Sequence, residues 1–107
     1  MVPAVSVSTD SNGYLVDRED WSPDLAVTMA ANDGIELTEA HWEIIRFVQN
    51  YYDEFADAPP MRVLVKAIAR RIGADKGNSR YLYRLFPEGP AKQVCRYAGL
   101  PKPTSCI

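Results

Sequence analysis

The sequence has few of the residues that most often bind metals or form catalytic pairs: two cysteines and one histidine among 107 residues. This set is too small for a closed tetrahedral zinc site without carboxylate ligands, so we expect no metal and no cofactor. A single histidine, His41, also leaves no Ser-His-Asp or Cys-His arrangement to predict. We interpret His41 as a residue of a helix surface or of the edge of the core.

Long apolar segments are missing as well. No run approaches the roughly 20 residues that a helix needs to cross a bilayer. The N-terminus, MVPAVSVSTDSNG, lacks the basic start and the apolar stretch of a secretory signal. We therefore expect a cytoplasmic protein without membrane insertion. In that compartment, two cysteines favour redox or sulfur chemistry over structural disulfides.

Charge is distributed unevenly along the chain. Residues 1–57 hold twelve acidic and two basic side chains, whereas residues 58–107 hold two acidic and ten basic ones. The net charge of −2 therefore conceals a basic half that attracts anionic partners. The composition, 47% hydrophobic and 24% charged, is ordinary for one soluble domain, which we expect to span 1–107.

Helix signals dominate the middle of the chain. Ser22 before Pro23 is a predicted N-cap, Thr38 is another, and Gly73 is a predicted C-terminal stop. The longest helix repeats apolar residues at helical spacing and should form the centre of the core. These residues are Ile44, Val48, Tyr51 and Phe55, joined by Trp42, Ile45 and Tyr52. The predicted helices cover 23–31, 38–55, 61–72, 79–86 and 90–98.

The two ends differ from this helical middle. Segment 5–16 alternates valine with serine and turns through Ser11-Asn12-Gly13, which is a strong hairpin signal. Two prolines after Gly99 exclude a helix there and predict a flexible C-terminal arm over 99–107. The predicted fold is thus mainly α: a small orthogonal, helix-turn-helix-like bundle (23–98) with an N-terminal β-hairpin and a C-terminal arm.

The penultimate residue, Cys106, is the first candidate for sulfur chemistry. It lies seven residues beyond Gly99, so an extended arm projects its thiol by at most about 23 Å at about 3.3 Å per residue. The terminal carboxylate should raise the thiol pKa, whereas Lys102 opposes that shift. An exposed thiol on a proline-stiffened arm is able to enter a channel of another protein.

Cys95, in the last predicted helix, is the second candidate. Lys92, three residues earlier, and the adjacent Arg96 favour its thiolate, whereas the C-terminal end of the helix disfavours it. We therefore expect a moderately activated thiol; a buried or indifferent cysteine is the alternative. A reversible bridge to Cys106 requires Cα atoms within about 4.4–6.8 Å and a chain reversal, for which Gly99 is suited.

The segment Met61–Phe86 consists of two predicted helices joined by a glycine-containing loop. It carries seven basic residues: Arg62, Lys66, Arg70, Arg71, Lys76, Arg80 and Arg84. This pattern leaves a helix-turn-helix DNA-binding regulator as a remote alternative, with a steep salt dependence of DNA affinity as its mark. A docking face for an acidic protein fits the same charges. Because the second helix keeps few outward positions, we do not expect nucleic acid as a partner.

A specific set of motifs fills the C-terminal part: Leu85-Phe86-Pro87-Glu88-Gly89-Pro90-Ala91-Lys92-Gln93, then Cys95, then Ala98-Gly99-Leu100-Pro101-Lys102-Pro103, then Cys106. Together with Gly13-Tyr14-Leu15 and Asp20-Trp21, it resembles the DsrC/TusE family, whose best-known member is called the gamma subunit of dissimilatory sulfite reductase. The resemblance covers nearly the whole chain and implies a compact helical domain with a hairpin and a mobile arm.

The resemblance also implies a sulfur carrier of dissimilatory sulfur metabolism. Cys106 is then expected to accept and deliver sulfane sulfur as a persulfide, and Cys95 to share it as a trisulfide, with Lys92, Arg96 and Lys102 in support. The implied partners are a siroheme sulfite reductase of the DsrAB type, upstream TusA/DsrEFH-type sulfur-transfer proteins and a membrane-bound disulfide or trisulfide reductase complex. Such a carrier is a co-substrate of its partners rather than an independent catalyst.

A second branch of the family, TusE, relays sulfur for the 2-thiolation of wobble uridine in tRNA and generally keeps only the penultimate cysteine. Having both Cys95 and Cys106 favours the DsrC branch, with the TusE role as the alternative. The loop over 74–79 is similar to the longer form of sulfur oxidisers and of TusE, which favours sulfur oxidation. Ser105 stands where the family usually has glycine, and it restricts the backbone beside Cys106.

Overall fold

The computed structural model describes Thr9 and residues 13–101. It contains a short 3-10 helix and five α-helices: η1 (Arg18–Asp20), α1 (Pro23–Asn32), α2 (Glu39–Phe55), α3 (Met61–Arg71), α4 (Ser79–Leu85) and α5 (Pro90–Tyr97). The predicted mainly helical fold is confirmed, and within this part of the chain none of the helices is long and apolar enough to cross a membrane.

The predicted hairpin over 5–16 lies mostly outside the described residues. Its described part holds an isolated antiparallel bridge between Thr9 and Leu15. Tyr14 and Leu15 are both buried, so the segment after the expected turn packs onto the helical core.

Side-chain caps stand at the start of α1, as predicted, and also at the start of α4. The Ser22 hydroxyl accepts a hydrogen bond from the Leu25 backbone N–H at 3.1 Å, and Pro23 is the first residue of α1. The Asn78 side chain accepts from the Tyr81 N–H at 2.8 Å and caps α4 in the same way. Each such bond satisfies one of the free amides at a helix start.

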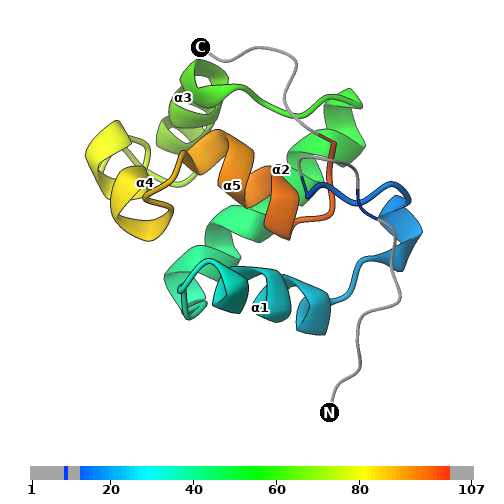
Figure 1. The fold of residues 1–107 in the computed structure, drawn as a ribbon. Helices are drawn as coiled ribbons and strands as arrows, with labels where there is room; N and C mark the ends of the chain where they lie inside the picture. The colour runs from blue at the N-terminus through cyan, green and yellow to red at the C-terminus, as the bar shows by residue number, and fades with distance from the viewer. Residues whose placement is uncertain (1–8, 10–12, 102–107) are drawn as a thin grey trace.

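α5 occupies the centre of the bundle, where it packs against each of the other four α-helices (Figure 1). Most of its residues are buried, including Val94, Cys95 and Tyr97. α5, the last helix of the described residues, is therefore a core element.

α2 supplies the rest of the core largely as predicted. Ile44, Ile45 and Val48 are fully buried. The assignment of Phe55 to the core face is wrong, because this last residue of α2 is 50% exposed. Its ring packs instead against Tyr51, with 4.6 Å between the ring centroids.

α3 and α4 form a helix-turn-helix arrangement with a very close backbone approach in the turn. A Cβ added at Gly77 would lie 2.2 Å from the Ala69 backbone nitrogen, far inside the contact distance. Gly77 is buried there, so the turn folds back onto α3 at a point that has no room for a side chain.

Candidate functional site

α5, which carries Cys95, begins and ends at glycines. Gly89, with a φ of 128°, precedes Pro90 at the first position of the helix. Gly99, with a φ of 76°, follows its end, and the Leu100 N–H donates to the Cys95 carbonyl at 2.9 Å. This bond closes a left-handed terminal turn of the Schellman type. Gly99 thus adopts the left-handed conformation for which it is suited, whereas the return of the chain from Gly99 to Cys106 lies outside the described residues.

Cys95 lies in the core, and its side chain is inaccessible. The residue is 0% exposed, and burial raises the pKa of its thiol to about 12. The expectation of moderate activation is therefore wrong: charges close in sequence do not compensate for the removal of this sulfur from water. In the described fold Cys95 matches the alternative of a buried cysteine.

Lys92 and Arg96, the two basic residues expected to support Cys95, form contacts with other parts of the chain. Arg96 forms an ion pair with Asp33, and its guanidinium carbon lies 5.5 Å from the centroid of the Tyr97 ring. Lys92 is exposed, and its backbone carbonyl accepts a hydrogen bond from the Tyr14 hydroxyl at 3.2 Å. Both contacts tether α5 to the N-terminal half of the chain.

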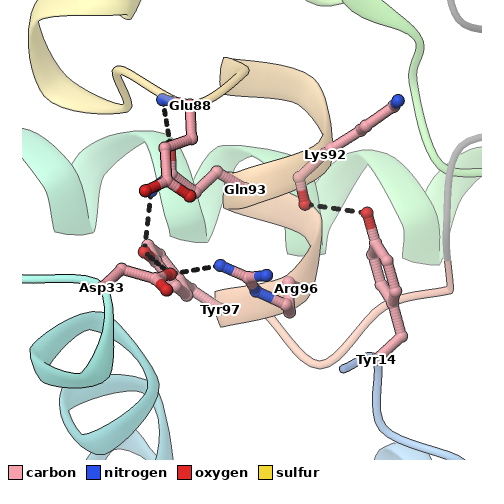
Figure 2. A network of polar contacts seen from close by, with 7 residues as sticks. All are labelled: Tyr14, Asp33, Glu88, Lys92, Gln93, Arg96 and Tyr97. Atoms are coloured by element: carbon pink, nitrogen blue, oxygen red, sulfur yellow. Dashed lines mark hydrogen bonds and ion pairs between the residues drawn. The ribbon is translucent and has the colours of Figure 1, made fainter. Parts of the chain in front are cut away.

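Arg96 belongs to a polar network that joins α1, α5 and the loop before α5 (Figure 2). The Tyr97 hydroxyl donates to the Asp33 carboxylate at 2.6 Å and accepts from the Gln93 side-chain amide at 2.9 Å. The Gln93 carbonyl oxygen accepts in turn from the Glu88 N–H at 3.0 Å. Burial and the bond to Asp33 raise the pKa of Tyr97 to about 12, so it remains a neutral donor.

The C-terminal end of α5 is held by two side chains that the sequence did not reveal. The Trp21 indole N–H donates to the Tyr97 carbonyl at 2.6 Å, and the Gln49 amide donates to the Ala98 carbonyl at 3.0 Å. Trp21 is partly buried against the core as expected, but its polar contact was not anticipated. The sequence predicts only that the last carbonyls of a helix need hydrogen-bond donors from elsewhere. It does not identify which side chains supply them.

His41 has a structural position at the edge of the core, as interpreted from the sequence. Its Nδ1 accepts from the Thr38 N–H at 3.1 Å, and Nε2 lies 2.9 Å from the Leu85 carbonyl, to which it donates. Burial lowers the pKa of His41. The imidazole links the start of α2 to the end of α4 and leaves neither nitrogen for catalysis.

The basic residues of α3 and α4 lie largely on the surface. Arg71 pairs with Glu54 at 3.3 Å and Lys76 with Glu43 at 2.9 Å. The remaining five are exposed: Arg62, Lys66, Arg70, Arg80 and Arg84. These positions are compatible with an anionic partner, and the DNA-binding alternative stays a prediction.

Cys106 and Lys102 lie outside the described residues, so the structure does not place them relative to Cys95. Pro101, the last described residue, is exposed. Among the described residues, no cluster of three or more His, Cys, Asp or Glu is arranged to hold a metal ion.

Comparisons with known proteins agree with the motifs of the C-terminal part. The model of the family described as DsrC like protein matches residues 2–107. A sulfurtransferase named TusE from Salmonella paratyphi A is 60% identical over 101 residues, covering 94% of this chain and 93% of the relative.

Solved structures of DsrC have the same fold. The DsrC of Allochromatium vinosum has a TM-score of 0.86 and 55% identity, covering 94% of this chain and 90% of its own. The oxidised gamma subunit of the dissimilatory sulfite reductase (DsrC) from Archaeoglobus fulgidus has a TM-score of 0.80 and 44% identity, covering 94% and 92%. The chain belongs to the DsrC-like family.

Proposed function

We propose that the protein is a cytoplasmic sulfur-relay protein that carries sulfur on Cys106 alone, as a TusE-type sulfurtransferase acting in the 2-thiolation of wobble uridine in tRNA. The observation that carries this proposal is the burial of Cys95, which removes the second cysteine from the reactive surface. The 60% identity to a TusE sulfurtransferase supports the same branch.

The pKa of Cys95 gives this burial a chemical consequence. Burial raises the pKa of the Cys95 thiol to about 12, so the thiolate, which is the nucleophilic form, is scarce at neutral pH. A bridge from Cys95 to another sulfur also requires contact that a fully buried side chain does not allow. The burial of Cys95 therefore supports a relay in which Cys95 does not resolve a persulfide on Cys106.

A single thiol is sufficient for relay. The Cys106 thiolate attacks the outer sulfur of a persulfide on a donor protein, so that a new S–S bond forms at Cys106. The S–S bond of the donor breaks, and the donor thiolate leaves with the electron pair. The persulfide on Cys106 then passes to an acceptor thiol by the same exchange. No net oxidation takes place, and no second cysteine of this chain takes part.

Persulfide loading of two variants tests the proposal. After incubation with a persulfide-loaded donor protein, Cys95→Ala should gain the mass of one sulfur atom as the unaltered protein does, whereas Cys106→Ser should not. Alanine is chosen at residue 95 because it leaves no unpaired hydroxyl in the core. Loss of loading in a folded Cys95→Ala protein would contradict the proposal. So would failure of Cys95→Ala to restore 2-thiouridine in the tRNA of a strain that lacks TusE.

A second function is supported by a specific feature, the presence of Cys95 eleven residues before Cys106. In a DsrC-type role, both cysteines hold one sulfur as a trisulfide. The partners are then a siroheme sulfite reductase of the DsrAB type, DsrEFH- or TusA-type donors and a membrane-bound reductase complex. Similarity to the gamma subunit of Archaeoglobus fulgidus supports this role.

The two roles are separated by the product formed with sulfite, a siroheme sulfite reductase and a low-potential electron donor. The donor supplies two electrons per sulfite, and the thiols of Cys95 and Cys106 supply the other two that reduce the sulfur to the level of a trisulfide. Intact-mass analysis should find no species that links Cys95 to Cys106 if the relay uses one thiol. Accumulation of such a trisulfide, and its loss in Cys95→Ala, would favour the DsrC role instead.

A further inference from the structure

The backbone carbonyls at the end of α5 all have hydrogen-bond partners. A helix normally leaves its last four carbonyls without partners in the helix. Here the backbone N–H groups of residues 98–100 donate hydrogen bonds to three carbonyls in the last turns of α5. Ala98 donates to Val94, Gly99 to Arg96 and Leu100 to Cys95. The two carbonyls that remain, of Tyr97 and Ala98, accept from Trp21 and Gln49. We call Trp21 and Gln49 the exit clamp.

The clamp is also closely packed around the turn that it holds. A Cβ added at Gly99 would lie 2.7 to 2.9 Å from three carbon atoms of Trp21, so the turn rests directly on the indole. Leu100 is 0% exposed, as is Cys95, whereas the next residue, Pro101, is exposed. The chain therefore changes from core to surface between Leu100 and Pro101.

We propose that Trp21 and Gln49 are positioning residues for sulfur relay, which fix the point where the chain leaves the domain toward Cys106 and keep Cys95 closed. Neither residue touches the sulfur; each acts through a carbonyl of the terminal turn. The relay part of this inference rests on the proposed function, whereas the closure of Cys95 does not.

The position of the exit determines the reach of the carrier thiol. With Leu100 anchored, six residues lead to Cys106, which is at most about 20 Å at about 3.3 Å per residue. If the turn opens as far as Cys95, the separation along the chain between the last anchored residue and Cys106 grows from six to eleven residues, and the effective concentration of the thiol at a docked partner falls about two- to threefold. The same opening exposes a second thiol that competes for sulfur.

Labelling of Cys95 in the native state tests the closure. In a Cys106→Ser background, Trp21→Phe removes the indole N–H but keeps a ring, and Gln49→Met keeps the length but removes the donor. Tyr14→Phe is the matched control, because it also removes a side-chain bond to a carbonyl of α5, that of Lys92, away from the exit. The readout is the rate of Cys95 modification by iodoacetamide, followed by mass spectrometry.

Each clamp variant should label about fivefold faster than the parent, which is the change in open population expected from one lost hydrogen bond. The labelling rate of Cys95 should not change with urea at low concentration, because a local opening exposes little new surface to the solvent. The Tyr14→Phe control should label at the parental rate. Equal rates in all variants, or an acceleration that follows global unfolding with urea, would overturn the proposal.

A second readout tests the positioning of Cys106 in a Cys95→Ala background. Loading of Cys106 from glutathione persulfide, a small donor, should be unchanged by the clamp variants. Loading from a persulfide-loaded DsrEFH-type protein should slow in the double variant Trp21→Phe/Gln49→Met, which loses both donors, in proportion to the fraction of open molecules and by about two- to threefold at full opening. Equal loading from the protein donor would overturn the positioning role. A parent protein that never loads would overturn the proposed function instead, and Cys95 labelling would still decide the closure.

Discussion

α5 and the α3–α4 pair are held in place by different means. α5 is tied to distant segments by polar groups, among them Asp33, Trp21 and Gln49. α3 and α4 are joined by a turn in which Gly77 meets the backbone of Ala69. The position of α5 therefore depends on several hydrogen-bonding groups, in addition to the close packing of Gly99 on Trp21, whereas the α3–α4 turn depends on a backbone approach at Gly77 that leaves no room for a side chain. Opposite kinds of substitution should disturb the two regions.

The largest effect is expected from one added methyl group in the α3–α4 turn. Gly77→Ala places a Cβ 2.2 Å from the Ala69 nitrogen, and backbone atoms are unable to move aside as a side chain does. We expect a loss of about 3 kcal/mol or more in the free energy of unfolding, measured by urea denaturation.

Gly34→Ala is the control for the Gly77 substitution. No atom lies within 4 Å of its new Cβ, and its φ of 78° alone should cost about 1–2 kcal/mol. Equal losses at the two glycines would contradict the close approach at Ala69 as the cause.

The polar attachment of α5 is tested by a pair of carboxylate deletions. Asp33→Ala leaves Arg96 without its ion-pair partner and Tyr97 without its acceptor, in a region where both charged side chains are about three-quarters buried. We expect a loss of about 2 kcal/mol. Glu54→Ala removes the partner of Arg71 in a pair that is half exposed, and should cost about 0.5 kcal/mol or less. Thermal or urea unfolding of both variants checks this order, and a reversed order would contradict it.

The same comparison shows which parts of the structure the sequence could predict. The helix bounds follow from local signals, such as Ser22 before Pro23 and Gly99 after α5, because capping acts within a few residues. The clamp joins residues that are 76 and 49 positions apart in the sequence. No local pattern gives that pairing, since Gln49 differs in no way from another polar residue of an amphipathic helix.

The environment of Cys95 was beyond sequence reasoning for a related reason. Lys92 and Arg96 are near Cys95 in the sequence, and proximity suggested that they act on its thiol. The electrostatics depend instead on where each side chain lies: Arg96 forms an ion pair with Asp33, and Lys92 is exposed. Burial then dominates the pKa. Burial on all sides depends on α5 lying at the centre of the bundle, which is a property of the whole fold.

The smallest effect expected of a main variant, as opposed to a control, concerns the charges that α3 leaves in solvent. Arg62, Lys66 and Arg70 are exposed at intervals of four residues, and none of them has an ion pair among the described residues. Like charges at this spacing repel. Lys66→Glu replaces two repulsive pairs by two attractive ones, and should stabilise the protein by about 1 kcal/mol at low salt.

High salt gives the control for this last prediction. At 1 M salt the screening length is about 3 Å, so the gain from Lys66→Glu should disappear. Lys66→Gln, which removes the charge without reversing it, should give about half of the low-salt gain. Urea unfolding at both salt concentrations measures these differences. A stabilisation that persists at high salt would point to helix propensity rather than charge. A lower free energy of unfolding for Lys66→Glu at low salt would contradict the prediction, because it would show that Lys66 is attracted by acidic groups of the chain more than it is repelled by Arg62 and Arg70. Arg96 of α5 differs from these residues, since its charge is neutralised by one partner, Asp33.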